Sequence, residues 1–201
     1  DPARSSSHIL TPKPTGSGYE TFDSYLSRVD DWIFSRGGAT VGVANVDLTL
    51  TGGQNGIVIK SICARIIKRS PIMNGSLFYV SPQGGRPVST ILNLDSAEPC
   101  ARYFNDNYLT LSSGQSTVID LSVLAHSDTV TWSLYLNAVV NGIQQMIPVD
   151  SGQILRTTGL LPELTQYGIF YEFTDTGNYS GIFRPTIPEA SEQKALEQQF
   201  G

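Results

Sequence analysis

The sequence predicts an all-β protein, an antiparallel β-sandwich of about 9–11 strands with one N-terminal amphipathic helix. Two observations lead to this prediction. From residue 41 to about residue 183, short runs rich in Val, Ile, Thr and aromatic residues alternate with a period of two. Turn residues rather than helical patterns separate these runs, so the helical crossovers that parallel sheets need are not indicated.

Composition places the chain among globular proteins and excludes some classes of function. Its 201 residues are 40% hydrophobic and 15% charged, which is enough apolar material for a sizeable core. Thirteen basic residues against eighteen acidic ones give a net charge of -5, which argues against binding nucleic acid. No run approaches the roughly 20 apolar residues of a membrane span. Residues 1–10 do not resemble a signal peptide, so we expect any targeting element upstream of Asp1.

The N-terminal part divides into a linker and a helix. Residues 1–18 are rich in Pro, Ser, Thr and Gly and predict a flexible linker. Residues 21–36 place apolar side chains on one helical face, with Thr21 as a candidate N-cap and Gly37-Gly38 as the stop. We expect this helix to cover a sheet face or to close one end of the sandwich. The apolar positions are Phe22, Tyr25, Leu26, Val29 and Ile33.

The strands follow in order, and turn chemistry separates them. Gly52–Gly56 is a turn, and Asn141-Gly142 is the strongest hairpin signal because both residues tolerate the positive φ of a type I′ turn. We predict a single domain over residues 19–188 and a polar, helix-prone tail at 189–201. The expected strands are 41–51, 57–69, 75–81, 88–94, 108–112, 116–125, 129–140, 144–149, 154–158, 168–174 and 179–183.

The alternation also predicts which side chains form the core. We expect inward-facing apolar residues from most strands, together with one residue of the helix. The predicted set is Trp32 or Ile33, Val46, Leu48, Ile59, Ile62, Ile66, Leu77, Leu94, Leu121, Val123, Trp132 and Leu134.

The chain offers little for catalysis, so we predict that it is not an enzyme and uses no cofactor. His8 lies in the linker and His126 in a hairpin turn, and neither is placed beside a nucleophile. The two His and two Cys are far apart, without the spacing of a metal site. Asn105–Asn107 and Asp175–Asn178 are the segments most like a calcium site, but their composition is that of ordinary turns. A hydrolase would need two facing carboxylates, and the sequence does not show which of Asp47, Asp95, Asp120, Glu163 and Glu172 could meet.

Aromatic and polar residues cluster near the C-terminal end and form the best candidate ligand site. Exposed aromatic rings provide flat platforms for sugars, and neighbouring Asp and Asn side chains can hydrogen-bond to hydroxyl groups. The alternative interpretation is a terminal strand that packs one aromatic face inward. The candidate residues are Tyr167, Tyr171, Asp175, Asn178 and Tyr179.

Two cysteines, Cys63 and Cys100, leave two alternatives open. They could form one disulfide, which would suit an exported protein, or remain two separate thiols. A Cα–Cα distance above about 7 Å would exclude the disulfide.

Several segments resemble an uncharacterised family, the extracytoplasmic β-sandwich domain of actinobacterial single-pass membrane proteins. They are LTLTGGQNGIVIKSICARIIKRSP, GSLFYVSPQGG, LNLD ending at Asp95, VTWSLYLNAVVNG and VDSGQILRTTG, which together span about residues 46–159. The resemblance implies a domain that follows a Pro/Ser-rich linker and a transmembrane helix, in some members with a helix-turn-helix regulator inside the cell. It carries no catalytic residues, and the cysteines are not part of its pattern.

We therefore expect a non-catalytic binding, sensing or interaction domain, extracellular or at the cell surface and tethered through its N-terminal linker. Its partner would be a protein or a glycan at the cell surface, and the domain itself would bind no nucleic acid and meet the membrane only through its tether. One alternative is a carbohydrate-binding module that uses the aromatic residues at 167–179. A second alternative is an Asp/Glu-dependent hydrolase.

Overall fold

The computed structural model describes residues 22–79, 90–177 and 180–200, and it is mostly β with mixed sheets and two helices. Contacts within the chain divide it into two compact units. The two-sheet unit comprises residues 39–73 and 86–160. The three-segment unit comprises residues 1–38, 74–85 and 161–201. The single domain expected over 19–188 and the linker expected at 1–18 stay predictions, and residues 1–18 lie outside the described residues.

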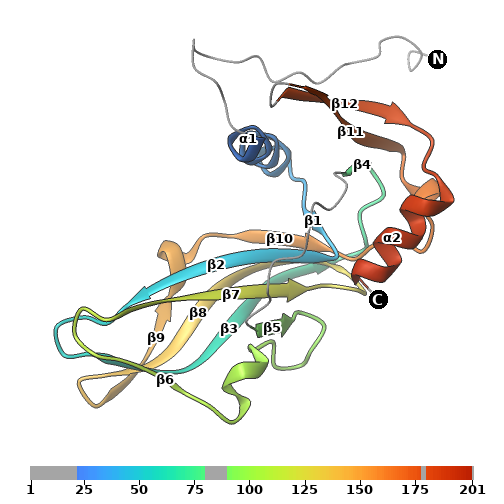
Figure 1. Cartoon of the computed structure of the whole chain (residues 1–201). Helices are drawn as coiled ribbons and strands as arrows, with labels where there is room; N and C mark the ends of the chain where they lie inside the picture. Colours follow the sequence, from blue (N-terminus) through green and yellow to red (C-terminus); the bar gives the residue numbers. More distant parts are fainter. Residues whose placement is uncertain (1–21, 80–89, 178–179, 201) are drawn as a thin grey trace. The chain divides into compact units, whose positions relative to one another are not determined.

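The larger sheet of the two-sheet unit has six strands in the order β1-β10-β8-β3-β6, with β9 also paired to β8 (Figure 1). The hairpin of β8 and β9 turns at Asn141 (φ 53°) and Gly142 (φ 76°), the positive φ values that the sequence predicts. The strands are β1 (Thr40–Val41), β3 (Ile57–Ser70), β6 (Leu109–Leu111), β8 (Thr129–Val140), β9 (Ile143–Pro148) and β10 (Leu155–Thr158).

The smaller sheet of this unit has the order β2-β7-β5 and shares one hydrophobic core with the larger sheet. It comprises β2 (Val43–Thr51), β7 (Ser116–Leu124) and β5 (Thr90–Asn93), and short 3-10 turns lie at Arg102–Asn105 and Val149–Gly152. Trp132 is fully buried in the core, and its indole N–H donates to the Thr157 hydroxyl over 3.0 Å. Predicted core residues that are buried in this unit are Leu48, Ile59, Ile62, Leu94, Leu121, Val123, Trp132 and Leu134, whereas Val46 and Ile66 are partly buried against them.

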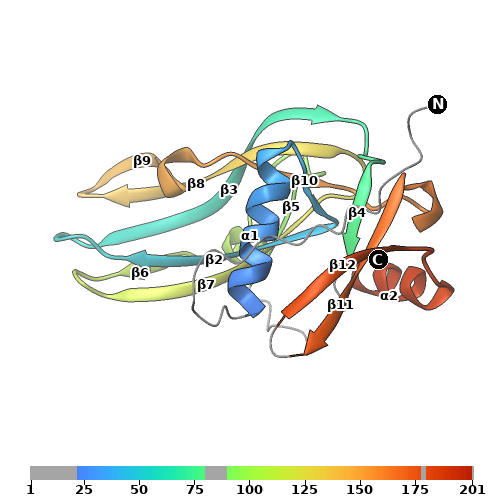
Figure 2. The same ribbon diagram turned by 90° about the horizontal axis from the view of Figure 1, so that it is seen from above.

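The three-segment unit contains a sheet in the order β12-β11-β4 and both helices (Figure 2). Its elements are α1 (Phe22–Ser35), β4 (Ser76–Tyr79), β11 (Ile169–Gly177), β12 (Ser180–Thr186) and α2 (Ala190–Phe200). Val29 and Ile33 of α1 pack against aromatic rings of all three strands, and Leu77 is buried in the same unit. The helix ends where predicted: Gly38 donates to the Ile33 carbonyl, and a Cβ at Gly38 would lie 2.8 Å from that oxygen.

One feature of the predicted fold needs correction. The mostly β character is confirmed, but each of the three sheets contains a parallel pair, namely β1–β10, β5–β7 and β4–β11. Period-two alternation does not report strand direction, and the members of each parallel pair come from distant parts of the chain. The tail predicted at 189–201 to be polar and helix-prone contains the second helix, α2.

Candidate functional site

The described residues of the predicted aromatic site are packing residues of the three-segment unit. The Tyr171 ring stacks on Phe78 at 4.9 Å with an interplanar angle of 6°. Tyr167 is 8% exposed, and its hydroxyl accepts a hydrogen bond from the Leu161 amide over 3.1 Å. Burial raises the pKa of Tyr167, and the Leu161 amide acts in the opposite direction.

The remaining members of that set are not described. Asn178, Tyr179 and the side chain of Asp175 lie outside the described residues. Phe78 covers one face of the Tyr171 ring, and Tyr167 is buried. These two residues therefore do not provide two exposed rings on which a sugar could stack. Ligand binding by the set stays a prediction.

A polar cluster in the two-sheet unit joins three segments that are far apart in sequence. Asp95 follows β5 after a bend in which its amide donates to the Asn93 side-chain oxygen over 2.9 Å. His126 and Asp128 lie in the turn between β7 and β8, and Arg69 lies near the end of β3. We call these four residues, Arg69, Asp95, His126 and Asp128, the Asp–His cluster.

The Asp95 carboxylate is the centre of the Asp–His cluster. It accepts from the His126 amide over 2.8 Å and lies 3.1 Å from His126 Nδ1. Arg69 donates to the Leu94 carbonyl over 2.5 Å. Its guanidinium also lies 4.0 Å from Asp95 and 3.6 Å from Asp128. The cluster therefore fixes the β7–β8 turn to the end of β5 and to β3.

A carboxylate that orients a histidine is also part of nucleophilic catalytic sites, where the other ring nitrogen faces a hydroxyl or thiol. Among the described residues, the His126 ring hydrogen-bonds to Asp95 alone. Arg69 and Asp128 are more than one-third exposed, so each ion pair of Arg69 contributes at most about 0–1 kcal/mol. His126 is exposed as well. These contacts suit a structural role. The sequence interpretation of His126 as a turn residue missed Asp95, because 31 positions separate them and no local pattern links them.

Strand pairing brings together one pair of the carboxylates considered for a hydrolase. Asp47 of β2 lies directly opposite Asp120 of β7. The Ala125 amide bonds the Gly42 carbonyl in the same ladder, so alternation makes 47–120 a non-hydrogen-bonded pair, with Cα atoms about 4.5 Å apart. Asp95 belongs to the Asp–His cluster, and Glu163 and Glu172 belong to the other unit. In the part of the chain that the structure describes, no three His, Cys, Asp or Glu side chains group as metal ligands.

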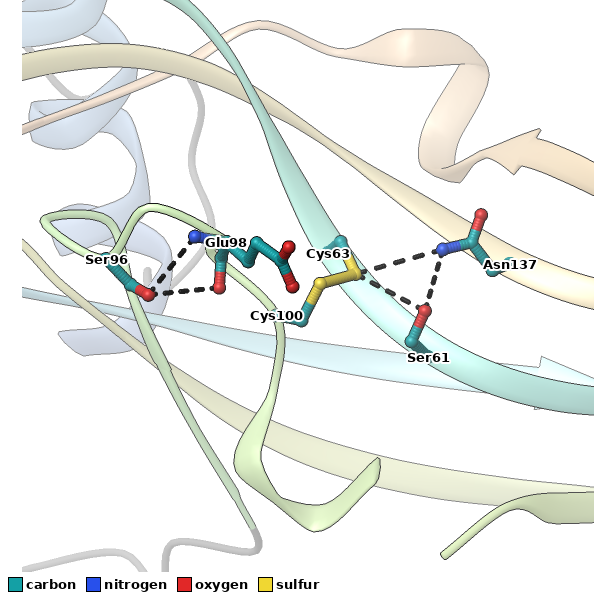
Figure 3. Close-up of a disulfide and its surroundings, with 6 residues drawn as sticks. All are labelled: Ser61, Cys63, Ser96, Glu98, Cys100 and Asn137. Carbon is teal, nitrogen blue, oxygen red and sulfur yellow. Dashed lines mark hydrogen bonds between the residues drawn. A yellow bond between two sulfur atoms is a disulfide. The ribbon is translucent and has the colours of Figure 1, made fainter. Parts of the chain in front are cut away.

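The structure joins the two cysteines, one of the alternatives that the sequence left open. The sulfur atoms of Cys63 and Cys100 are bonded, and the Cα atoms are 4.0 Å apart, within the 7 Å limit (Figure 3). Backbone bonds from Ala64 to Pro99 and from Ala101 to Ile62, both 2.8 Å, flank the pair. The cysteines are thus opposite each other in an antiparallel bridge beside β3, at a non-hydrogen-bonded position.

The surroundings of the disulfide are ordered by polar contacts on both sides. Asn137 of β8 donates to the Ser61 hydroxyl over 2.8 Å, and that hydroxyl lies 3.3 Å from the Cys63 sulfur (Figure 3). In the loop before Cys100, the Glu98 amide donates to the Ser96 hydroxyl, which in turn donates to the Glu98 carbonyl. Cys63 itself is 1% exposed, whereas Cys100 is partly exposed. The disulfide therefore joins a buried position of β3 to the partly exposed loop beside it.

Comparisons with known proteins add no relative: the chain matches no protein-family model, no curated protein and no solved structure. Neither helix in the described part of the chain has the length and apolar character needed to cross a membrane.

Proposed function

We propose that this chain is a non-catalytic module that acts outside the cytoplasm, at a cell surface, by binding or sensing another molecule. The observation that carries the proposal is the Cys63–Cys100 disulfide. Disulfides persist in oxidising compartments and are rare in the cytosol, where thiol reductants keep cysteines reduced. A disulfide that joins buried Cys63 to Cys100 is therefore best explained by export.

Three further points support this proposal. The two-sheet unit, with one core between two sheets, is consistent with the β-sandwich architecture of many cell-surface domains. The resemblance to the extracytoplasmic actinobacterial family would add a membrane tether upstream of the flexible linker expected at 1–18. The contacts of the Asp–His cluster suit a structural role, which is compatible with a module that does no chemistry.

Labelling of intact cells that produce the full-length protein tests the location. Thr49→Cys places a thiol on an exposed strand position, and a membrane-impermeant maleimide should label it without lysis. Mass spectrometry without reduction should recover Cys63 joined to Cys100. Labelling only after lysis, together with reduced Cys63 and Cys100, would overturn the proposal. The parent chain, which has no free cysteine, is the matched control for background labelling.

Carbohydrate binding is a second candidate, and a specific observation favours a site that the sequence analysis did not single out. Residues 102–108 carry Tyr103 and Tyr108, which are 46% and 70% exposed, on either side of exposed Asn105, Asp106 and Asn107. Exposed tyrosines beside amide and carboxylate groups match the stacking faces and hydroxyl-binding groups that sugars require. We call residues 102–108 the tyrosine loop.

The tyrosine loop is held in place before any ligand arrives, which lowers the entropy cost of binding. Phe104 is buried in the core, and the Tyr103 amide donates to the buried Thr90 hydroxyl over 3.1 Å. Asn107 donates to the Tyr103 carbonyl over 3.0 Å, which closes the loop on itself. The disulfide at Cys100 fixes its entry.

A glycan array distinguishes the two carbohydrate sites. Binding that is lost in Tyr108→Ala but kept in Tyr179→Ala would assign the tyrosine loop. The reverse pattern would assign the C-terminal aromatic set, and a parent chain that binds no glycan would remove this candidate.

An Asp/Glu-dependent hydrolase is a third candidate, and the opposed pair Asp47 and Asp120 favours it. Asp47→Asn and Asp120→Asn would each abolish hydrolysis of chromogenic glycosides by the parent chain. No turnover by the parent, or turnover unchanged in both variants, would remove it.

A further inference from the structure

Strand β9 is an exposed edge of the larger sheet. It pairs with β8 along one side, and no strand in the described part of the chain pairs with its other side (Figure 2). Ile143 and Met146 are 63% and 64% exposed, and Gln144 and Gln145 are exposed as well. An edge strand of this kind presents unpaired backbone groups to any extended chain that can approach it.

β9 also lacks the main protection that natural edges carry. Charged side chains usually block edge-to-edge pairing, and two longer strands of this unit carry them, whereas the uncharged edge strands β1, β5 and β6 are only two to four residues long. β3 carries Lys68 and Arg69 near its end, and β2 carries Asp47. β9 reads IQQMIP and contains no charge, although the chain as a whole has a net charge of -5.

The hairpin geometry determines which backbone groups of β9 point outward. In a two-residue hairpin the residues that flank the turn, here Val140 and Ile143, exchange both hydrogen bonds. Alternation along the ladder then directs the amide and carbonyl of Gln144 and Met146 away from β8. Pro148 occupies the next outward position and has no N–H to donate.

We propose that β9 pairs antiparallel with β9 of a second copy of this chain, about a two-fold axis that passes through Gln145. In this register Gln144 of each copy exchanges hydrogen bonds with Met146 of the other, and Ile143 lies opposite Ile147. Moving the axis to Met146 would place Pro148 opposite Gln144 and remove a donor on each side. Moving it to Gln144 would run the pairing into the Asn141-Gly142 turn. The sequence around Gln145 therefore selects one register.

The same symmetry explains why a second copy is the partner. On a two-fold axis a residue meets its own counterpart, and its neighbours lie close to theirs, so a charge at or beside Gln145 would lie near a like charge. The strand I-Q-Q-M-I is neutral and has isoleucine at both ends, so in this register the isoleucines of one copy lie opposite those of the other. This association is independent of the proposed cell-surface function and can fail without affecting it.

Charge substitutions at the axis test the proposal. Gln145→Glu and Gln145→Lys each place like charges about 5 Å apart, which should weaken self-association about tenfold. An equimolar mixture of the two variants should restore it, because the introduced carboxylate of one copy would then face the introduced ammonium group of the other. Sedimentation equilibrium over a concentration series measures all three, and circular dichroism checks that each variant is folded.

Cysteine cross-linking tests the register independently. The chain has no free cysteine, so Gln145→Cys would introduce a single thiol on the axis. It should form a covalent dimer under mild oxidation, whereas Gln144→Cys, two residues out of register with its own copy, should react much more slowly.

A parent chain that is monomeric at every concentration would overturn the proposal. So would a dimer that both Gln145 charge variants leave unchanged, or cross-linking that is equally fast at positions 144 and 145.

Discussion

Removal of the disulfide should destabilise the two-sheet unit by an amount that its loop length sets. The change is Cys63→Ala together with Cys100→Ala, because alanine leaves no buried hydroxyl at a position that is almost fully buried. The bond spans a sequence separation of 37 residues. In the chain-entropy account, closing a loop of this length lowers the stability of the unfolded state by about 4 kcal/mol.

The loop that the disulfide closes includes a segment of the other unit. Between Cys63 and Cys100 the chain leaves the two-sheet unit, supplies β4 to the three-segment unit at residues 74–85, and returns. Without the bond, the unfolded chain regains the conformational freedom of all the residues between the two cysteines. In the folded state, the backbone hydrogen bonds from Ala64 to Pro99 and from Ala101 to Ile62 remain. The predicted loss of stability therefore arises mainly because the unfolded state gains conformational entropy.

Urea unfolding followed by the fluorescence of Trp132, which is buried in the two-sheet unit, measures the change. Trp32→Phe in both proteins removes the second indole signal. We expect a loss of about 4 kcal/mol and a fall in the thermal midpoint on the order of 10 °C. The parent chain in reductant should match the alanine variant, and reductant should not affect the variant.

A loss below about 1 kcal/mol would refute the loop-entropy reasoning. A parent chain that keeps its stability after complete reduction, beside an alanine variant that loses it, would show that side-chain packing and not the cross-link is responsible.

Three other substitutions test separate parts of the structure. Thr157→Val keeps the shape of the side chain but leaves the buried Trp132 indole N–H without its acceptor, and should cost about 1–3 kcal/mol in urea unfolding, whereas Thr157→Ser should cost less. Asp95→Ala removes the acceptor of the His126 amide, and hydrogen exchange at that amide should accelerate, while an unchanged rate would contradict the Asp–His cluster. Phe183→Ala removes a buried ring from the three-segment unit and should cost about 3–5 kcal/mol, so a loss under 1 kcal/mol would show that this cluster does not stabilise the unit.

The strands were predictable because their side chains alternate and their turns have specific chemistry. The predicted bounds of 129–140 are those of β8, and Asn141-Gly142 forms the expected two-residue turn. Each face of β8 has a different environment, and this difference is visible in the sequence as an alternation of Trp132, Leu134 and Leu136 with polar or smaller residues.

Strand direction and the division of the chain were not predictable. β4 pairs in parallel with β11, which lies about 90 positions later, and no local turn or crossover motif connects them. β4 itself has an ordinary alternating pattern, so nothing in residues 74–85 indicates that they leave one unit for another. Pairing partners of this kind depend on tertiary packing and not on local sequence.

The candidate site shows why aromatic clusters are ambiguous. Phe170 packs near Tyr79, whereas Tyr171, the next residue of β11, stacks on Phe78. Successive side chains point to opposite faces of a strand, so β11 uses aromatic rings on both of its faces. The sequence showed many aromatic residues together, but it could not show that both faces find partners. The tyrosine loop was not predicted because the sequence does not show that Tyr103 and Tyr108 are exposed, and Asn105, Asp106 and Asn107 have the composition of a turn.

The position of the disulfide follows from the Asn141-Gly142 turn through strand register. The turn directs the backbone of Val140 toward β9, so alternate β8 residues, among them Tyr135, direct their hydrogen bonds toward β3. Cys63 pairs with Tyr135, after a register shift between Ile59 and Ser61, and is therefore left with a non-hydrogen-bonded position on its other side, where Cys100 lies. A one-residue slip of β3 would move the Cys63 side chain to the opposite face of the sheet and prevent the bond. The pairing of the two cysteines thus depends on both the Asn141-Gly142 turn and the register shift in β3, although all three features are distant in sequence.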